Sequence, residues 1–162
     1  MLIRRERPED AEVVDTVTRA AFGRELEPSL LARLRRDDGW LPELSLVAVE
    51  SGEVVGHVVC TRGFVGDAPV VGLGPISVRP DHQRCGVGHA LIHAVLGAAE
   101  ATGEPLVALL GNPVFYRRFG FMPASEAGID SPDPAWGEHF QIRTLGARVT
   151  GTFRYAATFA DL

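Results

Sequence analysis

The sequence contains no lysine, because all sixteen of its basic residues are arginine. That absence excludes a Walker A phosphate loop, a pyridoxal-phosphate Schiff base and any lysine nucleophile. The chain has only two cysteines, Cys60 and Cys85, which form no disulfide framework and favour a reducing, cytoplasmic location. No apolar run reaches the roughly 20 residues that cross a bilayer, and no signal peptide opens the chain, so no contact with a membrane is expected.

Positive charge is also scarce relative to negative charge. The formal net charge of -5 argues against a general nucleic-acid-binding protein, although a local patch could still engage an RNA or protein substrate. The 162 residues, 46% of them hydrophobic and 23% charged, suit a globular protein with a sizeable core. We expect residues 1–162 to form a single domain.

The first part of the chain predicts a short edge strand over residues 2–5 and two helices. Pro8 begins the first helix, at a position where its missing N–H is not needed, and Gly23 ends it. A second helix follows Pro28, with leucines facing inward and arginines at positions 33, 35 and 36 facing outward. These arginines fit either a solvated face or the rim of a site for an acidic substrate.

Three β-rich runs follow the helices. Residues 44–50 and 53–61 are joined by Ser51-Gly52, which indicates a hairpin. The next strand covers residues 70–78 and is interrupted by Gly74-Pro75. Because proline cannot donate a hydrogen bond to a sheet, this strand should bulge or splay there.

The remaining elements complete a mixed α/β pattern. A helix over residues 89–102, a buried strand over 106–110, a short helix or turn over 111–119, and closing strands over 139–145 and 148–155 are expected. The central strand–helix–strand unit predicts one parallel pair, and the hairpins predict antiparallel neighbours. The sum is a mixed sheet with helices on both faces.

The turn before the third helix is a candidate anion site. It contains Gln83, Arg84, Cys85, Gly86, Val87 and Gly88. Helix N-termini present unpaired N–H groups, and glycines allow a phosphate to approach the backbone. Arg79 adds a second positive charge. A dinucleotide-binding pattern would require a third glycine where Leu91 stands, so the local pattern fits an anion site or an ordinary tight turn.

The histidines carry weaker signals. His89 and His93 have the spacing of a zinc pair, but Ala90 replaces the expected glutamate and no third ligand is near, so no metal is expected. His57 lies within a strand, where it is either a hydrogen-bonded structural residue or a base in a substrate pocket.

Two stretches together resemble one family. Residues 76–92, ISVRPDHQRCGVGHALI, are similar to motif A of the GNAT superfamily of N-acetyltransferases, and residues 110–121, LGNPVFYRRFGF, are similar to its motif B. The hairpin and the first two helices fit the same order. The likeness is greatest to the YhbS-like branch. It implies a GNAT-like mixed, mostly antiparallel sheet of six to seven strands, splayed between the fourth and fifth, with helices on both faces.

The resemblance also implies acetyl-CoA as the acyl-donor cosubstrate, without a metal. Ile76, Ser77 and Val78 would offer backbone groups to the pantetheine arm, and Asn112 would lie near it. The pyrophosphate would be wrapped by residues 84–89, which are Arg84, Cys85, Gly86, Val87, Gly88 and His89.

Tyr116 is the expected catalytic residue, as the acid that protonates the departing thiolate after direct attack by an amine. The backbone N–H of Val78 is the candidate donor to the oxyanion. The ring of Tyr116 could also simply pack among nearby phenylalanines. Candidates for a general base are Glu43, His57 and His139, with a water relay as an equal alternative.

The expected function is acetyl transfer to a primary amine of a small molecule or protein. A non-catalytic acyl-CoA sensor or interaction module is the alternative, and the acidic balance disfavours a toxin that acetylates aminoacyl-tRNA. The acceptor walls are expected at residues 22–27, at the Trp40 turn and at residues 132–140 with Trp136, although both tryptophans could be packing residues. The oligomeric state is open, with a homodimer as one option.

Overall fold

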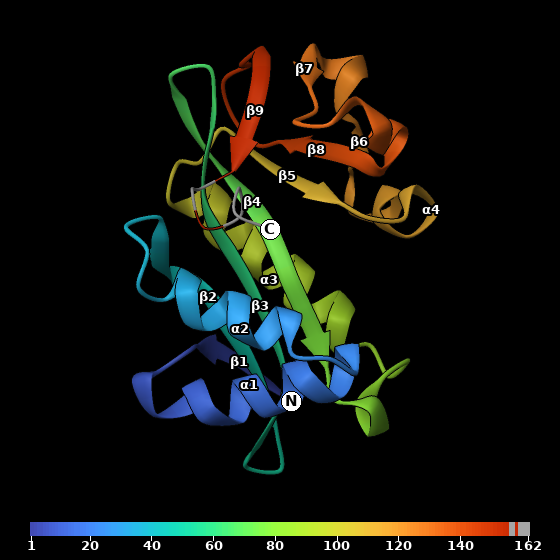
Figure 1. Cartoon of the computed structure of the whole chain (residues 1–162). Helices are drawn as coiled ribbons and strands as arrows, with labels where there is room; N and C mark the ends of the chain where they lie inside the picture. The colour runs from blue at the N-terminus through green and yellow to red at the C-terminus, as the bar shows by residue number, and fades with distance from the viewer. Residues whose placement is uncertain (156–157, 159–162) are drawn as a thin grey trace.

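The computed structural model describes residues 1–155 and Thr158. Its centre is a sheet in the order β1-β2-β3-β4-β5-β8-β6, to which β9 is added along β3 and β7 along β9 (Figure 1). The strands are β1 (Leu2–Arg5), β2 (Trp40–Glu50), β3 (Glu53–Val65), β4 (Ala68–Val78), β5 (Leu106–Leu110), β6 (Met122–Pro123), β7 (Ile129–Asp130), β8 (Phe140–Thr144) and β9 (Gly151–Tyr155).

The predicted mixed, mostly antiparallel sheet is confirmed. The parallel pairs are β4 with β5, as the strand–helix–strand unit predicts, and β7 with β9. The sheet has nine strands because β6 and β7, of two residues each, join the seven that the pattern predicts. Strands this short have no alternation of polar and apolar residues by which the sequence could reveal them.

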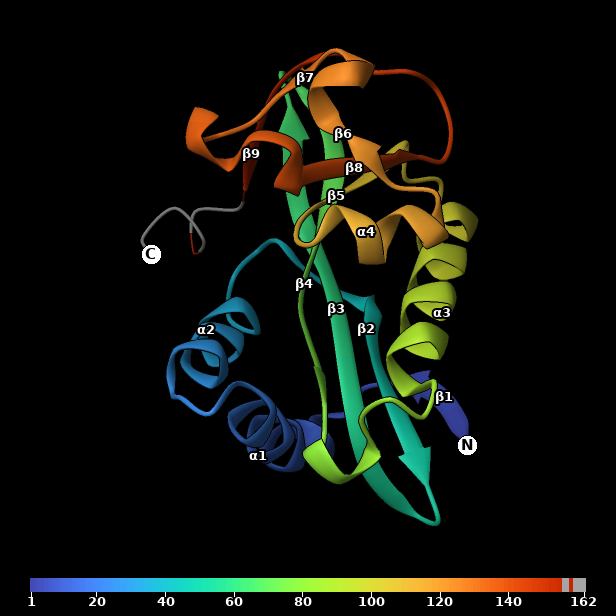
Figure 2. The ribbon, with the colours of Figure 1, turned by 90° about the vertical axis from the view of Figure 1, so that its right-hand side faces the viewer.

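Helices cover both faces of the sheet, as predicted. Figure 2 shows α1 (Ala11–Phe22) and α2 (Leu26–Leu34) on one side and α3 (Val87–Ala101) on the other. A fourth helix, α4 (Pro113–Tyr116), follows β5. Short 3-10 helices lie at Pro8–Asp10, Pro80–His82, Arg117–Phe119, Ala124–Ala127 and Pro134–His139. Among the described residues, no helix has the length and hydropathy needed to cross a membrane.

Strand β3 runs four residues beyond its predicted end because its last part pairs on both edges. Phe64 lies opposite Pro69 of β4 and Arg154 of β9. Gly63 makes this possible, since a Cβ there would lie 2.9 Å from the ring of Phe153. The glycine that suggests a loop in the sequence is therefore required by a close approach between strands.

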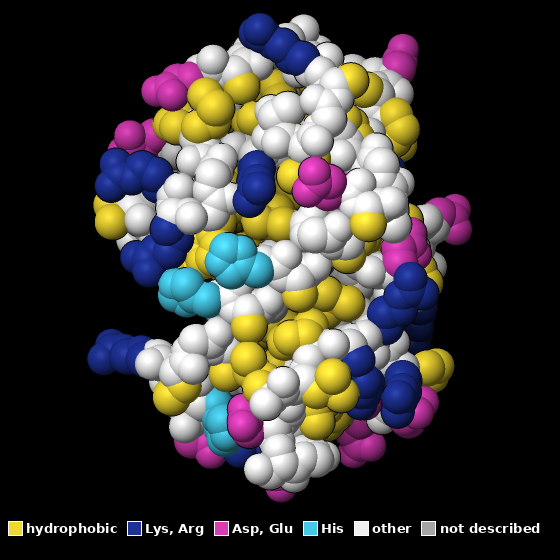
Figure 3. All heavy atoms as spheres, turned by 180° about the vertical axis from the view of Figure 1, so that it is seen from behind, with side chains coloured by type: hydrophobic (Ala, Val, Ile, Leu, Met, Phe, Trp, Pro, Cys, Tyr) yellow, Lys and Arg dark blue, Asp and Glu magenta, His cyan; other side chains and the backbone are white. Residues whose placement is uncertain are grey.

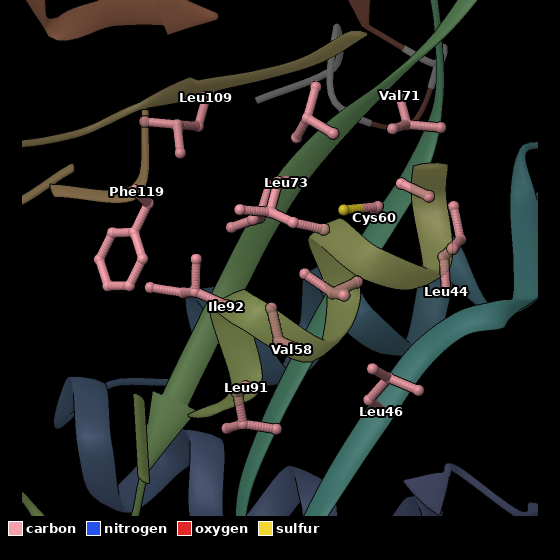
Figure 4. Close-up of a cluster of buried hydrophobic side chains, with 14 of the residues drawn as sticks. Leu44, Leu46, Val58, Cys60, Val71, Leu73, Leu91, Ile92, Leu109 and Phe119 are labelled. Atoms are coloured by element: carbon pink, nitrogen blue, oxygen red, sulfur yellow. The ribbon is translucent and has the colours of Figure 1, made fainter. Parts of the chain in front are cut away.

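The core on the α3 side holds that helix against the central strands. Leu91 and Ile92 of α3 belong to the same buried cluster as Val58, Cys60 and Leu73, all of which are drawn in the close-up of Figure 4. Each of these five side chains is at most 7% exposed. Burial of this kind contributes about 1.5–3 kcal/mol for each large side chain, which is enough to fix the position of the N-terminus of α3.

The opposite side contains a polar network beneath α1. His57 is fully buried, and its Nε2 lies 2.9 Å from Ser45 Oγ and 3.3 Å from Glu6 Oε2. Of the two hypotheses for His57, the structural one is therefore confirmed. Arg35 donates to Glu6 at 2.7 Å and to Asp15 at 3.0 Å, so the prediction that it faces solvent with its neighbours is wrong. Its partners are 29 and 20 residues away, beyond the reach of a helix-face pattern.

The sheet opens between β4 and β5. These strands pair only at Val71 with Val107 and at Gly72 with Ala108, and then diverge (Figure 1). Just beyond, Cys60 pairs with Leu73 but Val58 pairs with Ile76, so β4 carries one extra residue at Gly74-Pro75. The predicted bulge and the predicted splay between the fourth and fifth strands are confirmed.

The network around Glu6 should make stability depend on pH. Burial acts to raise the pKa of Glu6, but hydrogen bonds from His57 and Ser45 and the charge of Arg35 outweigh it and lower that pKa from 4.5 to about 2. The ionised carboxylate therefore stabilises the fold above about pH 4.5, and this contribution, about 3 kcal/mol, is lost as the pH falls toward 2. Urea unfolding of the Glu6→Gln variant should show a loss of this size at pH 7 and a smaller loss at pH 3.

The exposed Glu126→Gln variant is the control and should follow the wild type at both pH values. If the Glu6→Gln and wild-type free energies of unfolding fell in parallel with acid, Glu6 would not be the titrating group.

Candidate active site

The opening in the sheet exposes backbone groups of β4. The N–H of Arg79 donates to Val55 of β3 at 2.8 Å. Because backbone groups alternate in direction along a strand, the N–H groups of Val78 and Ile76 point away from β3, into the gap that β5 leaves. The carbonyl of Val78 also turns away from β3, since it accepts a hydrogen bond from Gln83 Nε2 at 3.0 Å.

Ser77 occupies the alternate position. Its backbone groups face His57 of β3, with which it is paired, and its buried hydroxyl lies 3.1 Å from Thr18 Oγ1 of α1. Ser77 therefore attaches β4 to α1. Of the three β4 residues predicted to contact the pantetheine arm, Ile76 and Val78 have backbone groups directed into the opening, and Ser77 does not.

The N-terminus of α3 borders a first cavity beside β4. Gly86 is the N-cap at φ 86°, and the first helical hydrogen bond runs from Ala90 N to Gly86 O at 3.0 Å. No side chain caps this end, which leaves the N–H groups of Val87, Gly88 and His89 without a helical partner. We call the adjoining space of about 480 Å³ the α3 cavity, lined by Val78, Gln83, Arg84, Gly86, Gly88, His89 and Phe115.

The two arginines predicted near the α3 cavity differ in whether their charge is already paired with a carboxylate. Arg79 donates to Asp81 at 2.7 Å and to Glu53 at 3.2 Å, and hydrogen bonds from Arg79 and His82 lower the pKa of Asp81 to about 2. The charge of Arg79 is thus compensated by ionised neighbours. Arg84 is exposed and forms no ion pair with any other described residue, so it is the available arginine of the two predicted.

The other residues predicted around the pyrophosphate lie at the same turn. Cys85 is exposed, and its thiol donates to Gln83 O at 3.4 Å. His89 lines the cavity, and its Nε2 lies 3.1 Å from Arg118 Nη1. Arg118 also lies over the ring of Phe115, 5.1 Å from its centroid. Sequence reasoning missed Arg118 as a cation near this turn, although it stands within motif B.

His89 and His93 do not form part of a metal cluster in the described part of the chain, where no three histidine, cysteine or acidic side chains gather. Their rings instead pack against Phe119, with centroids 5.2 and 5.1 Å away. Figure 3 shows histidine side chains beside hydrophobic ones on this face of the molecule. On this face of α3, both histidines therefore make aromatic contacts.

Tyr116 ends helix α4. Its ring packs among phenylalanines, and it also borders a cavity. Its ring contacts those of Phe115, Phe119 and Phe121, with centroids 4.9, 6.4 and 5.8 Å away. It also lines a second cavity. Burial raises the pKa of Tyr116, so its phenol remains protonated at neutral pH and can donate a proton.

Two neighbours in motif B place that tyrosine. Asn112 is the N-cap of α4, where its Oδ1 accepts a hydrogen bond from Val114 N at 2.9 Å. Gly111 leaves room for the ring, because a Cβ there would lie 2.5 Å from Tyr116 Cε2. Asn112 is exposed and lines neither cavity, so the structure gives it a capping role, and its contact with pantetheine stays a prediction.

We call the second space, of about 560 Å³, the Tyr116 cavity. Ile76 lines this cavity and Val78 lines the α3 cavity, so the two spaces border neighbouring positions on the opened part of β4. The Tyr116 cavity is lined by Phe22, Arg24, Leu26, Glu27, Leu30, Leu73, Gly74, Pro75, Ile76, Leu109, Leu110, Tyr116, Trp136 and Tyr155.

This lining agrees with part of the expected acceptor wall. Phe22 and Trp136 border the Tyr116 cavity, but Trp40 borders a separate space of about 390 Å³ with Glu6 and Arg35. The three candidate bases Glu43, His57 and His139 are absent from the lining of the Tyr116 cavity.

The expected acceptor wall at residues 22–27 includes Glu27, which lines the Tyr116 cavity, but sequence reasoning gave this residue no role of its own. It is 6% exposed in the first turn of α2. A signal was present: Glu27 stands at helical spacing with Leu30, Leu31 and Leu34, on the inward face of that helix.

Comparison with known proteins identifies this arrangement. The family described as "Acetyltransferase (GNAT) family" matches residues 12–121 of this chain. The chain is 38% identical over 158 residues to the uncharacterized N-acetyltransferase YjhQ of Escherichia coli strain K12. This alignment covers 91% of this chain and 87% of that protein.

Solved structures agree. The crystal structure of YhbS, a GNAT family N-acetyltransferase from Escherichia coli in complex with CoA, matches with a TM-score of 0.91 and 31% identity over 98% of this chain and 91% of that one. A GNAT family acetyltransferase from Brucella melitensis in complex with acetyl-CoA matches with a TM-score of 0.82 and 34% identity over 98% and 97%. The family predicted from motifs A and B is confirmed, and the chain belongs to the GNAT family of N-acetyltransferases.

Proposed function

We propose that the protein transfers the acetyl group of acetyl-CoA directly to a primary amine of a small molecule or protein. The observation that carries this proposal is that the two cavities border neighbouring positions on β4. The backbone N–H groups of Ile76 and Val78 point into the opening, and Tyr116 lines the same cavity as Ile76. The two structural relatives in complex with CoA and acetyl-CoA support the same donor here.

In this proposal the α3 cavity takes the pyrophosphate. The free N–H groups at the start of α3 and the partial positive charge of the helix end suit an anion. Arg84 supplies a full charge, while Cys85 contributes only its backbone. The pantetheine arm then extends along β4, where it pairs with Ile76 and Val78 as an added strand would, and this brings the thioester toward Tyr116.

The chemistry follows from this placement. The neutral amine nitrogen forms a bond to the thioester carbonyl carbon, and the N–H of Val78 stabilises the developing oxyanion. As the C–S bond breaks, the thiolate takes the phenolic proton of Tyr116, which regains a proton through water from the new amide nitrogen. The ordinary pKa values, about 8.5 for a thiol and about 10 for a phenol, place about 2 kcal/mol against this transfer, and the burial that raises the pKa of Tyr116 adds to that cost.

The alternative is a non-catalytic acyl-CoA sensor, in which Tyr116 would serve only as a packing residue. An aminoacyl-tRNA substrate is not favoured, because six of the arginines (Arg4, Arg19, Arg24, Arg35, Arg62 and Arg79) are paired with carboxylates. A single domain over residues 1–162, a cytoplasmic location, a homodimer and the lack of a metal stay predictions.

Acetyl-CoA should stabilise the protein against heat. A ligand at 100 times its dissociation constant adds about 2.7 kcal/mol to the free energy of unfolding, which is a shift of several degrees in Tm for a domain of this size. Gly88→Glu should abolish the shift, since its carboxylate would stand against the pyrophosphate. The space is open, with Val78 Cγ2 3.8 Å from the new Cβ, so the variant should fold.

Gly97→Glu is the matched control, because Gly97 lies exposed on the same helix with no atom within 4 Å of a Cβ. It should retain the full shift. A wild-type Tm unmoved by millimolar acetyl-CoA would contradict donor binding, and a shift retained by Gly88→Glu would move the phosphate site elsewhere.

Tyr116→Phe should lower kcat by about 10²–10⁴, the usual contribution of a positioned acid, while the thermal shift with acetyl-CoA remains. Release of free CoA in the presence of an amine measures kcat. The substitution preserves the ring contacts, so a packing role alone predicts no change. Unaltered turnover would remove Tyr116 from the mechanism.

Gly111→Ala should also lower kcat, because its methyl group would displace the Tyr116 ring. Gly146→Ala is the control, as its Cβ would come no closer than 3.7 Å to the atoms around it. If Gly111 acts only through Tyr116, the double variant with Tyr116→Phe should be no slower than Tyr116→Phe alone. Additive losses of kcat would show that Gly111 serves another purpose.

A further inference from the structure

The Tyr116 cavity contains a carboxylate that the proposed mechanism leaves unused. Glu27 lines it, and this side chain is the one carboxylate among the described residues of the lining. The side chain of Glu27 is only 7% exposed. A buried carboxylate beside apolar walls requires a cationic partner, because an uncompensated charge there is strongly destabilising.

The present partner of Glu27 is weakly held. Arg24 Nε donates to both carboxylate oxygens, at 2.5 and 3.0 Å, but the Arg24 side chain is 61% exposed and lies three residues away in the sequence. Because the guanidinium of Arg24 is largely exposed, solvent screens this ion pair and weakens its hold on Glu27. The two oxygens have lone pairs beyond those that Arg24 uses, so a cation entering the cavity could share or replace this partner.

Apart from Arg24, the partner of Glu27, the lining is mostly apolar and favours an apolar ligand. Phe22, Leu26 and Leu30 come from the helices, Leu73 and Pro75 from the bulge of β4, and Trp136 from the opposite side. A volume of about 560 Å³ falls within the range of small-molecule sites. Among the described lining residues, no second carboxylate is present to receive a second positive charge.

We infer that the acceptor is a small primary amine with an aromatic or branched apolar body, and that Glu27 binds its ammonium group. This inference rests on the proposed function and specifies its substrate class. A carboxylate beside the amine would be repelled by the buried Glu27. Arg24 also lines the cavity, but it is 61% exposed and already paired with Glu27, so it offers little compensation and free amino acids are disfavoured. The second charge of a polyamine would be buried among apolar walls, which disfavours polyamines. Tyr116 borders the same cavity, so Glu27 would position the amine on the side where the thioester is expected. The bound ammonium group then loses one proton through water to solvent, which gives the neutral amine that attacks the thioester.

Three amines test this substrate class on the wild-type protein. Phenylethylamine and phenylalanine differ only by a carboxylate, and spermidine carries additional charge without an aromatic ring. We expect kcat/KM for phenylethylamine to exceed that of either competitor by at least about tenfold, which corresponds to one strong charge effect. Equal or faster acetylation of phenylalanine or spermidine would overturn the inference.

Glu27→Gln tests the assigned residue. It preserves shape and removes charge, so KM for phenylethylamine should rise at least about tenfold, and the preference over phenylalanine should shrink. Glu25→Gln is the matched control, because Glu25 is exposed, pairs with Arg19 and does not line the cavity. An unchanged KM in Glu27→Gln, in a protein that acetyl-CoA still stabilises, would overturn the role of Glu27.

The outcomes separate the inference from the proposed function. Acetylation of the charged competitors in preference to phenylethylamine would overturn the substrate class and leave the transferase function intact. Stabilisation by acetyl-CoA without CoA release for any of the three amines would overturn the substrate class and leave a protein amine or the sensor as the alternatives. The comparison of amines on the wild-type protein stands even if Glu27→Gln does not fold.

Discussion

The architecture depends on one break in backbone pairing. Strands β4 and β5 share two paired positions and then separate, and the extra residue at Gly74-Pro75 marks where they do so. Ile76 and Val78 are only partly buried, and the N–H groups that they turn into the opening are left without a partner strand, which favours an extended, hydrogen-bonding ligand there. The sheet is thus incomplete in a place that a thioester with amide groups along its arm can fill.

The elements around this opening are held by close contacts that do not depend on a ligand. On one side, Gly56 of β3 allows α3 to approach, since a Cβ there would lie 3.0 Å from both Val87 and Leu91. On the other side, Ser77 and Thr18 join β4 to α1. Gly111 allows Tyr116 to fold back against the end of β5. Both walls of the opening are therefore fixed by contacts of the protein itself, which is the preorganisation that transition-state stabilisation requires.

The donor part of the site could be predicted from sequence because it is local. The bulge follows from one Gly-Pro pair, and the anion site follows from a single turn that enters a helix. The position of Arg35 and the length of β3 could not be predicted, because both depend on partners distant in the sequence. The Tyr116 cavity is assembled from α1, α2, β4, β5 and later segments, so its lining has no contiguous motif. Even so, Glu27 had a detectable signal as a charged residue on an apolar helix face.

The two cavities differ in the sign of charge that they favour. Free N–H groups and Arg84 make the α3 cavity suitable for an anion, whereas Glu27 makes the Tyr116 cavity suitable for a cation. Acetyl-CoA carries its negative charges at one end and a neutral thioester at the other, while an amine arrives in water as an ammonium ion. This opposition favours entry of each substrate on its own side of β4, and it disfavours occupation of the acceptor side by the phosphates of a second CoA. Charge would then set the direction of binding, and the opened strand would set where the two substrates meet.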